Sequence, residues 1–178
     1  MSAPTTDQGT VLAEALNAVA PGRFRADRDA RGVLTAWFAL DDKDDLPPVA
    51  ALLRSLGARL ITITALSPHR APPGGEHALA YHFDLGGDLL TVTVTVPPGG
   101  AVKSLVPLFP AADWNEREFA ELYGIALEGH PNPRRLFVDE SVDGAALDRL
   151  IPFSTLANAA STKTLWETLL AAKGEDTP

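Results

Sequence analysis

Acidic and basic side chains gather in one stretch near the middle of the second half of the chain, WNEREFAELYGIALEGHPNPRRLF over 114–137. It holds four glutamates, three arginines and a histidine. A carboxylate and a histidine that meet can exchange protons as a general acid and base. Carboxylates and guanidinium groups that meet can instead form a two-bonded ion pair. The stretch is therefore a candidate acid–base site, docking surface or structural clamp.

The helical periodicity of 113–123 singles out Glu118. At about 100° per residue, Glu118 lies about 40° from both Trp114 and Leu122, inside an apolar stripe. A carboxylate on a buried face needs a cation or hydrogen-bond donors. We therefore predict that Glu118 is buried and ion-paired with Arg134 or Arg135, after the chain turns back.

The other charged residues of this helix are expected nearer the surface. Arg117 and Glu121 lie on the polar flank of the stripe, four residues apart, where they can pair with each other. Glu116 is also predicted nearer the surface, although its angle places it beside Tyr123, where partial covering is expected. The alternative is a free-standing enzyme that uses Glu118 and His130 as an acid–base pair, or a stand-alone binding module.

Few other residues have the spacing of a chemical site. The chain has no cysteine, and it lacks the HExxH, GxGxxG, GxxxxGK[ST] and GxSxG patterns. The remaining histidines, His69, His77 and His82, are predicted to be structural or solvated, with His82 on the polar face of a strand. We expect no catalytic residue, no metal and no cofactor in this chain.

Charge and hydropathy narrow the class of protein. Net charge is −8 and the pI is about 4.9, which disfavours nucleic-acid binding. Apolar residues make up 46% of the chain, enough for a core. The first residues lack the pattern of a signal peptide, and no apolar run is long enough for a membrane span, so we expect neither.

Alternating and helical patterns predict a single-domain α+β fold with a mostly antiparallel sheet and flanking helices. Helices are expected over 10–20, from Pro47 through Ser55, from near Val102 and over 113–123. Strands are expected over 23–28, 33–40 and 59–66. ALAYHFDL and DLLTVTVTVP, joined at Gly86-Gly87, predict a hairpin. We expect a flexible N-terminus over 1–9, one domain over 10–172 and a flexible tail over 173–178.

The charged stretch resembles the signature of the 30-kilodalton (C) subunit family of respiratory complex I, which the equivalent subunit of energy-converting [NiFe] hydrogenases shares. The resemblance rests on Glu116-Arg117-Glu118, then Glu121-Leu122-Tyr123-Gly124, then Gly129-His130-Pro131 and Arg134-Arg135-Leu136. It implies that these residues form a structural clamp and a docking surface rather than a catalytic site.

The resemblance also implies a role and partners. The chain would be a non-catalytic subunit in the peripheral arm of a membrane-associated NADH:quinone oxidoreductase or a related hydrogenase complex. Its partners would be the large subunit (49-kilodalton-like or [NiFe] type) and iron–sulfur subunits, on the cytoplasmic side, with membrane association only through the complex. Because a docked subunit exposes apolar surface when alone, we expect an exposed patch drawn from Phe109, Trp114, Phe137 and Trp166.

Overall fold

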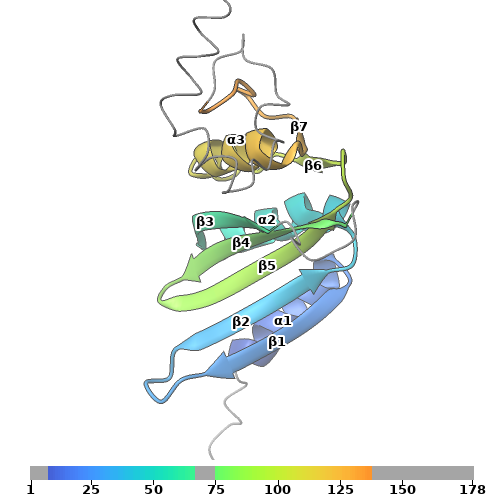
Figure 1. Cartoon of the computed structure of the whole chain (residues 1–178). Helices are drawn as coiled ribbons and strands as arrows, with labels where there is room; N and C mark the ends of the chain where they lie inside the picture. Colours follow the sequence, from blue (N-terminus) through green and yellow to red (C-terminus); the bar gives the residue numbers. More distant parts are fainter. Residues whose placement is uncertain (1–7, 67–74, 138–178) are drawn as a thin grey trace, which may run out of the picture. The chain divides into compact units, whose positions relative to one another are not determined.

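The computed structural model describes residues 8–66 and 75–137, which all lie in one compact unit. Within these residues the strands form a five-stranded sheet in the order β1-β2-β5-β4-β3 (Figure 1). Pairing is antiparallel between β1 and β2, β5 and β4, and β4 and β3, but β2 and β5 run parallel. The predicted α+β fold with a mostly antiparallel sheet is confirmed. His69, Trp166 and the tail 173–178 lie outside the described residues.

The strands follow the alternating patterns of the sequence. They are β1 (Gly22–Arg28), β2 (Leu34–Leu40), β3 (Arg59–Leu66), β4 (His77–Leu85) and β5 (Asp88–Val96). In β2 every second side chain is buried, as expected for a strand with one face on the core. Gly86 and Gly87 have φ values of 68° and 106°, so the predicted hairpin turn uses two residues that tolerate positive φ.

Helices α1 (Gln8–Val19) and α2 (Leu46–Ser55) pack against the same apolar core as the sheet. α2 follows a 3-10 turn (Lys43–Asp45) and has prolines in its first turn, where a missing N–H removes no helical hydrogen bond. Leu16 and Leu53 are fully buried and anchor the two helices to the core, which also contains Phe38, Tyr81 and Phe83. Among the described helices none is both long and apolar enough to cross a membrane.

The segment after the hairpin departs from expectation. Instead of a helix near Val102, the chain forms the short strand β6 (Ala101–Lys103), which pairs in parallel with β7 (Ala126–Glu128). The helix begins only at α3 (Ala112–Tyr123). Val102 is buried in the core, and the partner strand lies more than twenty residues later, so local periodicity could not reveal the pairing.

Helix α3 lies along the edge strand β3 (Figure 1). Asn115 Nδ2 donates to Thr62 Oγ1 at 3.4 Å, and Tyr123 Oη donates to the Ala65 carbonyl at the same distance. α3 therefore covers part of a sheet edge that would otherwise present unpaired backbone groups. The charged stretch 114–137 begins in α3, and α3 attaches it to the sheet.

Candidate functional site

The buried face of α3 is not the face that the sequence pattern indicated. Ala112, Glu116 and Phe119 are buried, whereas Trp114 is 67% exposed and Leu122 is 41% exposed. Relative to Glu118, the buried arc is centred about 130° away at the angular step of an α-helix. The apolar stripe through Trp114 and Leu122 therefore faces outward.

Glu116 is the buried carboxylate of the site. Its side chain is fully buried and accepts two short hydrogen bonds. Ser104 Oγ donates to Oε2 and the Leu105 N–H donates to Oε1, both at 2.6 Å. Burial raises the pKa of Glu116 to about 7, against the lowering effect of these two bonds, and the nearby Asp113 adds to the rise. Glu116 thus ties α3 to the loop that follows β6.

His130 completes this buried cluster from the turn after β7. The Asn132 N–H donates to its Nδ1 at 3.0 Å, so this nitrogen is the acceptor and Nε2 is the ring's donor. Nε2 lies 3.3 Å from Asp113 Oδ1 and 3.8 Å from Glu116 Oε2. Three elements, namely α3, the loop after β6 and the turn after β7, therefore converge on one polar core.

Tyr81 of β4 lies within the electrostatic field of the same cluster. Its hydroxyl is buried and has no hydrogen-bond partner within the described ranges. Desolvation, and secondly the Glu116 carboxylate, raise the pKa of Tyr81 well above its usual value. The phenol therefore stays neutral at physiological pH.

The predicted fold-back is formed by Arg117 and Glu121 rather than by Glu118. Arg117 donates from Nε to the Arg134 carbonyl and from Nη2 to the Arg135 carbonyl, each at 2.8 Å. Glu121 Oε2 accepts from the Leu136 and Phe137 N–H groups at 2.7 and 2.8 Å. Two charged side chains one helical turn apart thus hold the backbone of 134–137 against α3.

The prediction for Glu118 is therefore wrong. Its side chain is half-buried, beside Ile63 and Phe119 in a small groove between α3 and β3, and within the described residues it has no ion pair with Arg134 or Arg135. Glu116, predicted nearer the surface, is the fully buried carboxylate. Tryptophan and leucine usually mark the buried side of a helix, but here Trp114 and Leu122 are exposed.

The remaining residues of the signature shape the turns. Gly124 ends α3 with φ 65°, and Gly129 opens the His130 turn with φ 75°. Pro131 follows at the surface. Arg134 is exposed, and its Nε donates to Asn132 Oδ1 at 3.0 Å.

One basic and one aromatic residue of the signature, Arg135 and Tyr123, make further contacts. Arg135 is half-buried, and its carbonyl is one of the two that Arg117 binds. The Tyr123 ring lies 5.7 Å from the His77 ring, in a tilted arrangement. This contact joins the end of α3 to β4.

His82 has a structural position in the sheet. His82 bridges Thr64 Oγ1 at 3.1 Å and Thr91 Oγ1 at 3.0 Å on the face of the sheet opposite Tyr81, as its strand position predicted. Partial burial lowers the pKa of His82. In the part of the chain that the structure describes, no three acidic, histidine or cysteine side chains are grouped so as to hold a metal ion.

Sequence reasoning missed Asp113, Ser104 and Leu105 as members of the cluster. Ser104 Oγ also accepts from the Val106 N–H at 3.2 Å, a local turn that serine commonly forms. This local turn is the feature of the sequence that could have pointed to Ser104. The long-range bond to Glu116 depends on the fold and leaves no trace in residue spacing.

The arrangement can brace a backbone. Arg117 and Glu121 bind the backbone of 134–137, Glu116 binds Ser104 and Leu105, and His130 is buried. The fold and site define an α+β domain with an internally braced turn and an exposed apolar helix face.

Comparison with known families shows which family this domain matches. The model of the "Respiratory-chain NADH dehydrogenase, 30 Kd subunit" family matches residues 41–155, more than half of the chain. The chain therefore belongs to this family.

Individual relatives show how far the similarity extends. The C subunit of NADH-quinone oxidoreductase from Rhodopseudomonas palustris (strain TIE-1) is 47% identical over 53 residues, which cover 30% of this chain and 26% of that protein. The C/D subunit of the same oxidoreductase from Escherichia coli O6:K15:H31 is 27% identical over 153 residues, or 80% of this chain and 25% of that protein. The matched part thus spans about a quarter of the length of these relatives.

A solved structure shares the fold. A chain of the membrane-bound sulfane sulfur reductase, an archaeal respiratory membrane complex, superposes with a TM-score of 0.55 at 16% identity, covering 85% of this chain and 91% of that one. At this identity the likeness concerns the fold alone.

Proposed function

We propose that the chain is a non-catalytic subunit of the peripheral arm of a complex I-type NADH:quinone oxidoreductase or a related hydrogenase complex. Its role is assembly: it holds the large redox subunit and iron–sulfur subunits together. Membership of the 30-kilodalton subunit family is the observation that carries this proposal. The chain would be on the cytoplasmic side and reach the membrane only through its partners.

The geometry of the site supports an architectural role. Arg117 and Glu121 bind the backbone of 134–137, and the two oxygens of Glu116 accept from Ser104 and Leu105. The rival enzyme would need Glu118 near His130. His130 instead faces Asp113 and Glu116, whereas Glu118 lines a groove with Ile63 and Phe119.

Copurification tests the proposal. The full chain with an affinity tag is expressed in its native host, and membranes are solubilised in mild detergent. Mass spectrometry of the eluate should find a large subunit of the complex I or hydrogenase type and iron–sulfur proteins in near-equal amounts with the chain. A chain that elutes alone from solubilised membranes would overturn the assembly role.

A further inference from the structure

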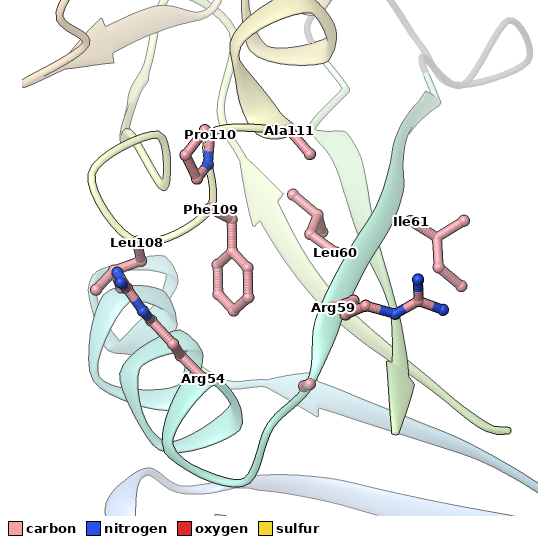
Figure 2. Close-up of a pocket in the computed structure, with 9 residues that line it drawn as sticks. Arg54, Arg59, Leu60, Ile61, Leu108, Phe109, Pro110 and Ala111 are labelled. Carbon is pink, nitrogen blue, oxygen red and sulfur yellow. The ribbon is translucent and has the colours of Figure 1, made fainter. Parts of the chain in front are cut away.

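A cavity of about 500 Å³ lies at the start of β3, between the end of α2 and the loop before α3 (Figure 2). Leu60, Phe109 and Pro110 supply apolar walls, and the Phe109 ring projects into the space. Phe109 packs edge-on against Phe83 with ring centroids 5.3 Å apart, so this wall is anchored to the core. The volume is in the range of sites that hold one or two side chains or a small ligand.

Two guanidinium groups flank this cavity on opposite sides (Figure 2). Arg59 is neutralised by Asp84, with Nη2 2.6 Å from Oδ2. Arg54 donates to the Pro107 carbonyl at 3.3 Å and has no carboxylate partner in the residues that the structure describes. An apolar cavity with one uncompensated cation at its rim is complementary to an apolar side chain that is followed closely by a carboxylate.

Part of the neighbouring strand edge has no backbone partner among the residues that the structure describes. On the far half of β3, Tyr123 Oη reaches the Ala65 carbonyl and Asn115 reaches the Thr62 side chain. Over 59–61 the edge away from β4 meets no backbone partner within the described ranges. The register with β4 is irregular between Leu60 and Thr62, and Ile61 is 55% exposed beside this open edge.

We propose that an extended segment of a partner protein adds to β3 at 59–61. Alternate side chains of an extended strand point to opposite faces. One side chain of the segment, apolar, enters the cavity beside Leu60 and Phe109, and a carboxylate two positions away on the same face binds Arg54. Side chains between them pass over Ile61. This proposal rests on the assembly role and names the surface that serves it.

A protein segment fits these features better than the other occupants. A small ligand would fill the cavity but leave the edge of β3 unpaired, whereas a strand satisfies both. A second copy of this chain is a poorer match for this surface. Its own edge strand β1 reads GRFRADR, in which three arginines outnumber one aspartate, so it does not offer the carboxylate that Arg54 needs.

Site-specific photo-crosslinking in the assembled complex tests the geometry. A benzophenone amino acid replaces Ile61 in the tagged chain, and a second chain carries it at Val11, which is exposed to a similar degree on α1. Crosslinked peptides are identified by mass spectrometry. At position 61 we expect one segment of another subunit that has an apolar residue and Asp or Glu two positions apart; position 11 should not yield that segment.

Charge reversal tests the contact with Arg54. Arg54→Glu should lower the ratio of copurified partner to tagged chain by about tenfold or more. Arg31→Glu, on an exposed arginine in the β1–β2 turn, should leave the ratio unchanged. Arg54→Gln, with a thermal melt on each variant, separates lost charge from lost folding and should give an intermediate ratio with a wild-type melting temperature.

Several results would overturn the proposal. These are crosslinks at position 61 only to this chain itself or to a second copy, a crosslinked segment without an acidic residue near it, and a wild-type ratio for folded Arg54→Glu. Each would leave the assembly role intact as long as the wild-type chain recovers its partners. Failure of the wild-type chain to recover any subunit would instead reject the assembly role itself.

Discussion

Glu116 lies where three parts of the site meet, namely α3, the loop after β6 and the turn after β7. It accepts from Ser104 and Leu105 and lies next to His130. Replacing it with alanine leaves buried donors without acceptors, which costs about 1–3 kcal/mol for each group, and opens a small cavity. We expect Glu116→Ala to lower the free energy of unfolding by about 2–4 kcal/mol, measured by denaturant melts.

Glu118→Ala is the matched control because both residues are glutamates on α3. Glu118 is partly exposed, so its loss should cost about 0–1 kcal/mol. Equal losses from the two variants would show that the Glu116 cluster does not stabilise the fold.

Ionisation of Glu116 should make the free energy of unfolding depend on pH. Its pKa is about 7 in the folded chain and about 4.5 when solvated, so between these values the native state binds more protons than the unfolded state. The free energy of unfolding therefore falls as pH rises from about 4.5 through 7, by about 3 kcal/mol in total.

Glu116→Gln keeps the shape of the side chain and cannot ionise. Melts of wild type and Glu116→Gln across this pH range should diverge, with the variant relatively more stable at the alkaline end than at the acidic end. Parallel curves would mean that Glu116 ionises normally in the folded protein.

At the scale of elements, the backbone of 134–137 is held to α3 by two side chains. Hydrogen bonds to a charged group contribute about 1.5–3 kcal/mol. Glu121→Ala should therefore accelerate hydrogen exchange of the Leu136 and Phe137 amides by about 10- to 100-fold, with little change in the β4–β5 hairpin. Glu14→Ala, on the exposed side of α1, is the control and should change neither.

Sequence patterns predicted the helices and strands that are specified by residues close together in the chain. The β4–β5 hairpin was predictable because alternating strands flank a Gly-Gly turn, and α2 because prolines begin it and Gly57, with φ 81°, follows it. Two features were not predictable from local spacing: the parallel pairing of β2 with β5 and that of β6 with β7. Parallel partners lie far apart in the chain, and no short-range signal records them.

The rotation of α3 was mispredicted for a physical reason. Periodicity finds an apolar stripe, but it cannot tell a core from a docking surface. Trp114 and Leu122 form an exposed stripe, and the true core face carries Glu116, whose burial is made tolerable by Ser104 and Leu105. The sequence predicted that the chain turns back toward α3, but the contacts that hold it there come from Arg117 and Glu121 rather than from Glu118.

At the scale of the whole molecule, apolar surface is exposed where a partner would cover it. Of the four aromatic residues predicted for such a patch, Trp114 and Phe137 are exposed, Phe109 is buried, and Trp166 lies outside the described residues. The isolated chain should therefore self-associate at high concentration, as measured by light scattering. Trp114→Ser should reduce the effect, and a wild-type chain that stays monomeric at millimolar concentration would contradict it.

The charged stretch is proposed to support assembly and not chemistry. The most direct test is electron-transfer turnover per mole of assembled complex for chains carrying Glu116→Ala, Arg117→Ala or His130→Ala. We expect less complex to assemble, while turnover per assembled complex remains at the wild-type level. Full assembly with turnover reduced a hundredfold or more would contradict it and would place these residues in the reaction itself.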